Sequence, residues 1–287
     1  MNKKNILISI GVLGIGIILY KLLLGLVLPI ALFVSLGYVL KFLLKDSESD
    51  SVKEVSQIFT SSDSSSSIDN IVEIKPGTYP VIFHPQLVQQ SLFEVINTAF
   101  NPTSLENGSS PLLNKIDHKI LNESIHLDQS GHHFPLDFNG YSSESCSVIE
   151  AGVLNYIPIA PQISKSLNQP ITSSNFDGSW FADLKMHNGT KSFEELIKEV
   201  DRGIYLVMSG DLVMGNILQG DMNGTIQTGF LIENGEIQGR IKNRSLGFNF
   251  YEILGDSLIG LSKDSIRYGV SHFTESPYVL ADDIRIS

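Results

Sequence analysis

The hydrophobic residues at the start of the chain fall into two long runs, 5–20 and 22–40, with Lys21 as the single charge between residues 5 and 40. A helix rises about 1.5 Å per residue and the hydrocarbon core of a bilayer is roughly 30 Å thick, so the second run is long enough to span it. The first run is shorter and would need a thinned bilayer or lysines that reach the interface. We therefore expect residues 1–45 to form a membrane anchor of one or two transmembrane helices.

Lysines flank these runs and bear on the orientation of the anchor. In a hairpin of two helices, the lysines at positions 3, 4, 41 and 45 all face one side, which the positive-inside tendency places in the cytoplasm. With a single span, lysines stand at both ends and the orientation stays open. No small-residue cleavage site follows Tyr20, which argues against a cleaved signal peptide. We expect a membrane-anchored protein whose soluble domain is cytoplasmic.

Polarity changes abruptly at Asp46. Residues 46–70 are acidic and rich in serine, with little apolar material to bury, which predicts a flexible solvated linker. Periodic apolar patterns begin at Ile71, so residues 71–287 are expected to form the folded domain. Its first segment, 71–83, reads as strand, turn and strand.

A helix is expected to begin at Pro85, because proline suits the first helical position. Apolar residues at helical spacing then give this helix a buried stripe, and Asn101-Pro102 ends it. The stripe consists of Val88, Leu92, Val95, Ile96 and Ala99.

The stretch 192–241 carries the strongest local signals. Ser192 and Glu195 have the spacing of a capping box, in which each side chain accepts a hydrogen bond from the other residue's backbone N–H. Phe193, Leu196, Ile197 and Val200 share one helical face. Gly203 is expected to end this helix in a left-handed conformation, followed by a strand over 204–207.

Two tight hairpins share one pattern. Asn234-Gly235 between apolar runs predicts a type I′ turn, which needs positive φ at both central residues. Residues 148–154 repeat the pattern of 231–237: an apolar pair, Glu, a turn residue, Gly and a returning strand. Further strands are expected over 119–128 and 278–286, with a short helix over 248–254. The fold class is therefore α+β, β-rich, with hairpins and a few short helices.

The composition argues against a disulfide-stabilised fold and against nucleic-acid binding. The single cysteine, Cys146, excludes an internal disulfide framework. The whole chain has 20 basic and 31 acidic residues, and five of the basic ones are lysines within residues 1–45. The remainder is strongly acidic and shows no basic stripe with interleaved aromatics, so we expect no direct nucleic-acid binding.

Three places in this sequence resemble the C-terminal domain of the TldD/PmbA proteins, once labelled modulators of DNA gyrase and regarded as a metallopeptidase system. They are 80–85 followed by an apolar helix, 135–140 leading into the hairpin at 149–152, and 192–203 with 229–237. The last is the most specific. The resemblance covers 77–287 and implies a β-rich domain that belongs to a proteolytic system.

This sequence also differs from the TldD type of that family at the positions of the zinc motif. The TldD type is expected to hold zinc through a His-Glu-x-x-x-His helix and a cysteine near the C-terminus. Here His84 is followed by Pro85, the helix contains no second histidine, and no cysteine follows Cys146. Two imidazoles on one helix face and a neighbouring glutamate are what bind the ion and activate its water. The chain therefore resembles the PmbA type, which pairs with a zinc-bearing TldD partner. We also expect the anchor and the linker to stand in place of the family's large N-terminal domain.

Other possible metal ligands are five residues that lie loosely together in the sequence: His118, His126, His132, His133 and Cys146. Adjacent histidines point to opposite sides of an extended chain, so His132 and His133 seldom reach one ion, and polar loop residues are the ordinary interpretation. His187 and His272 are isolated, and we interpret them as surface or hydrogen-bonded groups. The sequence assigns no catalytic, cofactor-binding or metal-binding residue.

Three acidic residues could act as catalytic carboxylates, and two aromatic residues could contribute to a binding groove. Asp137, Glu150 and Glu233 stand in turns or hairpins, where acidic residues commonly serve backbone geometry and solvation. Trp180 and Phe181 could line a peptide groove or belong to the core.

Three functions follow as hypotheses. The first is a membrane-tethered, non-catalytic subunit that assists proteolysis of unfolded peptides by a zinc-bearing partner and captures extended substrate at strand edges near the hairpins. The second is a membrane-anchored scaffold without the peptidase connection. The third, an independent hydrolase, is disfavoured by the missing metal motif.

Overall fold

The computed structural model describes residues 70–130, 136, 140–142, 145–159, 161–172, 183–210, 212, 215–268 and 273–287. The predicted anchor, 1–45, and the predicted linker up to residue 69 lie outside these ranges. Among the helices within them, none has the length and apolar character needed to cross a bilayer.

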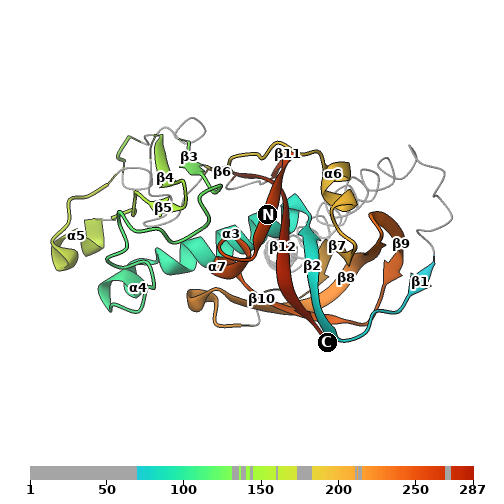
Figure 1. Cartoon of the computed structure of the whole chain (residues 1–287). Coiled ribbons are helices and arrows are strands. Elements are labelled where there is room, and N and C mark those ends of the chain that lie inside the picture. The colour runs from blue at the N-terminus through green and yellow to red at the C-terminus, as the bar shows by residue number, and fades with distance from the viewer. Residues whose placement is uncertain are drawn as a thin grey trace, which may run out of the picture. The chain divides into compact units, whose positions relative to one another are not determined.

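The described strands join into one mixed sheet (Figure 1). They are β1 (Ile71–Val72), β2 (Gly77–Phe83), β3 (Leu127–Gln129), β4 (Cys146–Glu150), β5 (Val153–Leu154), β6 (Asp183–Met186), β7 (Arg202–Gly210), β8 (Asp221–Glu233), β9 (Glu236–Ile241), β10 (Ser245–Asn249), β11 (Leu258–Tyr268) and β12 (Phe273–Ile286). The helices are α3 (Pro85–Ala99), α4 (Pro102–Glu106), α5 (Pro161–Leu167), α6 (Phe193–Lys198) and α7 (Phe250–Ile253), with a 3₁₀ turn η2 (Ile217–Gln219). The expected α+β class with short helices is confirmed.

Five strands close on themselves, and we call this ring of β2, β7, β8, β10 and β12 the barrel. β2 pairs with β7 in parallel and with β12 antiparallel, and β7 pairs antiparallel with β8. β10 completes the ring because Leu246 lies opposite both Gly224 of β8 and Ile286 of β12. Closure gives every barrel strand a backbone partner on each side, which removes exposed edges.

A second region lies beside β6 and contains α4, α5 and the short strands β3, β4 and β5 (Figure 1). We call residues 101–172 the loop lobe, as far as the structure describes them. Its strands extend the sheet in the order β12, β6, β3, β4, β5. Between α4 and β3, over residues 107–126, the chain runs mostly in turns and irregular segments.

Helix α3 confirms its predicted signals. Pro85 is its first residue, the side chain of His84 caps it, and the five apolar residues of the predicted stripe are each at most 2% exposed. The helix ends at Ala99, and the side chain of Asn101 then caps α4 by accepting the N–H of Thr103.

Helix α6 confirms the capping box but ends earlier than expected. Ser192 N donates to the carboxylate of Glu195 at 2.6 Å, and Glu195 N donates to Ser192 Oγ at 3.2 Å. The helix stops at Lys198, and Gly203 is not its left-handed cap but a residue of β7. A Cβ at Gly203 would lie 2.5 Å from the carbonyl oxygen of Pro80, so this glycine is required by the close approach of β2 and β7.

Both predicted hairpins are present, and both turns have the expected positive φ values. Asn234 and Gly235 have φ of 53° and 74°, and Ala151 and Gly152 have φ of 48° and 75°. The predicted strand over 119–128 is wrong, because only its end enters β3. Backbone N–H groups of Ile120 and Leu121 donate instead to the carbonyl of Gly152, so the segment packs around the hairpin turn rather than along a strand.

Both faces of β2 and β7 are covered in part of each strand, since residues 81–83 and 203–207 are all buried. Phe83 points to the side of α3 and α7 and meets Phe248 edge to face, with 5.1 Å between ring centroids. On the other side, Phe193 of α6 packs against Tyr205 and Tyr278 with ring centroids 4.8 Å and 4.4 Å away. Helix α6 thus covers one face and α3 the other.

Candidate functional site

The junction of β2 and α3 is where the sequence pattern places the metal-binding helix of the TldD type. His84 follows the last residue of β2 and is 3% exposed. Its backbone N–H donates to Leu206 O at 2.9 Å, and its Nδ1 accepts the N–H of Gln86 at 3.2 Å. Its ring meets Tyr278 edge to face, with 5.5 Å between centroids. The side chain therefore acts as a helix cap inside an aromatic environment.

Burial lowers the pKa of His84 to about 4, because the surroundings disfavour the charged imidazolium. The ring is neutral at physiological pH. With Nδ1 accepting a backbone hydrogen bond, its proton is placed on Nε2. Neither ring nitrogen then presents a free lone pair.

The residues around His84 do not fit a zinc ion. Pro85 stands where the motif has its glutamate, and Gln89 stands where it has its second histidine, five positions after the first. The amide nitrogen of Gln89 donates to Ile266 O at 2.5 Å. A tetrahedral site needs three or four imidazole, thiolate or carboxylate ligands, and this junction offers one histidine that is already engaged. In the described part of the chain, no three His, Cys, Asp or Glu residues are placed to hold a metal ion.

The loose histidine cluster does not converge. His118 is exposed and its Nδ1 lies 2.9 Å from Ile116 O. Cys146 is half-buried at the start of β4. His132 and His133 lie outside the described residues, as do Asp137, Trp180, Phe181 and His272.

An imidazole pair that the sequence did not predict joins His126 to His187. The rings stack with centroids 5.4 Å apart, and His187 Nε2 lies 2.7 Å from Asp128 Oδ2. His126 Nδ1 accepts the N–H of Ala151 at 3.3 Å. These bonds occupy one nitrogen of each ring and place the proton of a neutral His126 on Nε2, so the pair is not prepared to chelate a metal. The two residues are far apart in sequence and carry no local signal of their pairing.

Both candidate glutamates lie on the surface. Glu150 accepts a hydrogen bond from Asn155 Nδ2 at 3.4 Å, and Glu233 forms an ion pair with Arg202 Nε at 3.5 Å. They serve the hairpins in which they stand.

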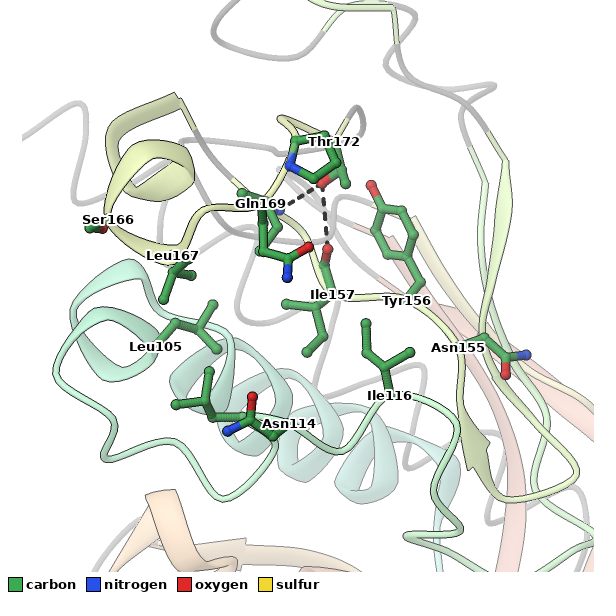
Figure 2. Close-up of a pocket in the computed structure, with 13 residues that line it drawn as sticks. Leu105, Asn114, Ile116, Asn155, Tyr156, Ile157, Ser166, Leu167, Gln169 and Thr172 are labelled. Atoms are coloured by element: carbon green, nitrogen blue, oxygen red, sulfur yellow. Dashed lines mark hydrogen bonds between the residues drawn. The ribbon is translucent and has the colours of Figure 1, made fainter.

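A cavity of about 500 Å³ in the loop lobe is the candidate binding site (Figure 2). This size falls within the range of roughly 300–1,000 Å³ typical of ligand pockets. Most of its wall is apolar, and no charged residue is among the 13 that line it. The aliphatic part of the wall consists of Leu105, Leu113, Ile116, Ile157, Ile159 and Leu167.

Side chains and backbone brace this cavity together. Thr172 Oγ1 accepts the N–H of Ile159 at 2.6 Å and donates to Ile157 O at 3.5 Å. The turn after α5 is held by Ser164 Oγ, which donates to Gln169 O at 2.6 Å. Figure 2 shows Leu105 and Leu167 facing each other, with Ile157 across from them and the amide of Gln169 directed into the space between. The arrangement can enclose an uncharged group and offers it amide hydrogen bonds.

Comparison with known proteins begins with a family match. Residues 76–287 match the sequence model of the family described as "PmbA/TldA metallopeptidase C-terminal domain". A "Metalloprotease" of Archaeoglobus fulgidus is 27% identical over 197 residues, which are 64% of this chain and 45% of that protein. A "Zinc metalloprotease TldD homolog" of Saccharolobus solfataricus is 30% identical over 205 residues, which are 66% of this chain and 45% of that protein. The chain thus spans less than half the length of these relatives.

The fold is similar to a solved structure as well. The crystal structure of TldE from Thermococcus kodakarensis superposes with a TM-score of 0.68 at 23% identity, over 77% of this chain and 53% of that one. The barrel and the loop lobe therefore form an architecture that is already known.

Proposed function

Because this chain belongs to the PmbA/TldA metallopeptidase C-terminal domain family, we propose that it is a non-catalytic subunit that assists a zinc-bearing partner in the proteolysis of unfolded peptides. Residues 1–45 tether it to a membrane, with the folded domain on the cytoplasmic side. The family resemblance expected from the sequence is confirmed by the match over residues 76–287.

One observation carries the non-catalytic assignment: the state of His84. A metal-binding imidazole needs a free lone pair and neighbouring ligands, whereas His84 is buried, neutral and engaged as the cap of α3. Proline and glutamine replace the two other motif residues. The reactive centre must then come from another chain.

A tether to the membrane is supported by the composition of residues 1–45. Their two apolar runs have few charges, and the lysines stand at the ends. Burying about 20 apolar residues in a bilayer anchors a protein firmly. A wash of membranes at high pH tests this directly: the full-length protein should stay with the lipid, and its release into the supernatant would overturn the tether without touching the peptidase assignment.

Co-purification followed by a cleavage assay tests whether the protein assists a peptidase. The full-length protein is purified from its own cells with its associated proteins, and a zinc-containing peptidase should be among them. Cleavage of casein, an unfolded substrate, should require the mixture and be abolished by a chelator. The isolated protein alone should not cleave casein.

Two outcomes would overturn this proposal. Chelator-sensitive cleavage by the isolated protein would place the reactive centre in this chain. A stable protein without an associated peptidase would favour the scaffold function instead. A His84→Asn variant serves as the control, because asparagine is also a good helix cap: it should leave the cleavage by the mixture unchanged.

A further inference from the structure

The wall of the loop-lobe cavity is uncharged, although the protein as a whole is strongly acidic. None of its 13 lining residues is an acidic or basic residue, while the chain as a whole carries 31 acidic residues. Transferring a charge into such a wall is unfavourable because no partner there replaces its hydration. The occupant must therefore be uncharged where it enters.

Two apolar side chains that line the cavity or adjoin its lining residues in sequence are also exposed. Ile116 lines it and is 42% exposed, and Ile171, which lies between the lining residues Pro170 and Thr172, is 40% exposed. An apolar surface of this kind gains stability when another apolar surface covers it. These exposed side chains, and not only the buried part of the wall, favour an apolar occupant.

Amide side chains in the cavity wall favour a peptide over a simple hydrocarbon as the occupant. Asn114 and Gln169 belong to the lining, and Gln169 directs its amide into the space (Figure 2). A side-chain amide offers one carbonyl acceptor and two N–H donors, which complement a peptide bond. An acyl chain would use none of them.

We propose that this cavity binds a short apolar segment of an unfolded polypeptide, with its side chains against the aliphatic wall and its backbone bonded to the amides of the lining. The assignment rests on the proposed function and adds to it the place where the peptide is held. It locates substrate capture in this chain, separate from the reactive centre of the partner.

Capture by strand addition is not available at the neighbouring hairpin. The outer edge of β5 is already covered, because Leu154 N donates to His118 O and Asp117 N donates to Leu154 O. Lys119 also forms a bridge with Val153. Peptide can therefore reach this end of the sheet through side-chain contacts in the cavity, and not by extending the sheet.

A binding titration tests the proposal. The probe is a fluorescein-labelled peptide of glycine and serine with a central run of leucines, and its counterpart carries aspartates at those places. Full-length protein is held in lipid nanodiscs, because a detergent would compete for an apolar cavity. Fluorescence anisotropy should rise with the leucine peptide and stay flat with the aspartate peptide.

Variants locate the binding. Ile116→Asp should weaken the leucine peptide about tenfold or more, since it places a charge against an apolar ligand. Ile259→Asp is the matched control, because Ile259 is 48% exposed on β11, outside this cavity; it should change the affinity by less than about twofold. Gln169→Ala removes one hydrogen-bonding amide from an exposed position and should weaken binding about threefold.

Equal affinities of the Ile116→Asp and Ile259→Asp variants would overturn the proposal. So would a cavity that binds dodecanol, sensitive to Ile116→Asp, but not the leucine peptide. Far-UV circular dichroism confirms that each variant is folded. Because no peptidase is present in this titration, its failure leaves the partner-dependent cleavage untouched, and a failure of that cleavage leaves the peptide binding standing.

Discussion

The barrel is held together by backbone pairing between strands, whereas the loop lobe depends more on side-chain hydrogen bonds. In the barrel, β2, β7, β8, β10 and β12 pair with neighbours on both sides, and Phe83 and Phe248 pack edge to face within it. In the loop lobe, short elements are held by single side-chain bonds such as Thr172 Oγ1 to the backbone of Ile159. That bracing encloses about 500 Å³.

Because of this difference, we expect the barrel to provide most of the stability and the loop lobe to provide the binding site. Backbone ladders fix the distance between barrel strands, so the side chains between them fill a defined space. Loops lack this restraint and can surround a hollow, which is why binding sites gather on loops carried by a rigid scaffold. The barrel should therefore dominate the unfolding free energy, and the loop lobe should be the region that tolerates change and contacts ligand.

The largest effect is expected from Phe83→Ala in the barrel. Phe83 is 2% exposed, and its truncation removes a ring that contacts Phe248, so the unfolding free energy should fall by about 3–5 kcal/mol. Urea unfolding followed by circular dichroism measures this loss. Ile259→Ala is the control at a half-exposed site and should change the stability by less than about 0.5 kcal/mol. A loss for Phe83→Ala below that of the loop-lobe variant described below would break the comparison.

A pH dependence of stability should belong to the barrel junction. The pKa of His84 is lowered in the folded state to about 4 from an ordinary value of 6.5, so between these values the unfolded chain binds the additional proton. Stability from this group is fully present above pH 6.5 and is lost as the pH falls towards 4, by about 3 kcal/mol in all. Unfolding of the native protein and of His84→Asn over this pH window measures the difference.

Asparagine has no titrating group and keeps a cap at the start of α3. The His84→Asn variant should therefore lose less stability on acidification than the native protein. Parallel pH curves for the two proteins would mean that His84 binds its proton equally well in the folded and the unfolded state, contrary to its burial.

In the loop lobe, Leu105→Ala should have a smaller effect than Phe83→Ala. Leu105 is 1% exposed, yet one side of it faces the cavity, so fewer packing contacts are lost when it is shortened. We expect a loss of about 2 kcal/mol, the lower end of the range for such substitutions. The same urea series measures it. A loss above about 4 kcal/mol, near the upper end of that range, would show that the lobe packs as tightly as the barrel.

Local signals in the sequence predicted the barrel side well. The capping box at Ser192, the buried stripe of α3 and the Asn234-Gly235 turn each depend on a few neighbouring residues, and all three are confirmed. Gly203 was placed wrongly because the helix-ending pattern cannot register the carbonyl of Pro80, which lies more than a hundred residues earlier in the chain. Close approach between distant strands leaves no local signal.

The candidate site was much less predictable. The sequence assigned no binding residue, whereas the cavity gathers Leu105, Ile157 and Gln169 from three separate segments. No periodicity links them, since each belongs to a loop or a short helix. The His126–His187 stack was missed for the same reason. Sites assembled by loops depend on tertiary contacts that a one-dimensional pattern does not contain.

The two type I′ hairpins allow the finest test, because one stands in each region. Ala151 has φ of 48° and Asn234 has φ of 53°, a conformation that alanine adopts at a cost of roughly 1–2 kcal/mol and that asparagine tolerates. Ala151→Gly should therefore stabilise the loop lobe by about 0.5–1 kcal/mol, after the greater freedom of glycine in the unfolded chain offsets part of the gain. Asn234→Gly should stay within about 0.5 kcal/mol of the native protein. If both substitutions had the same effect, the strain would lie in the turn type and not in the residue, and the lobe hairpin would be no weaker than its barrel counterpart.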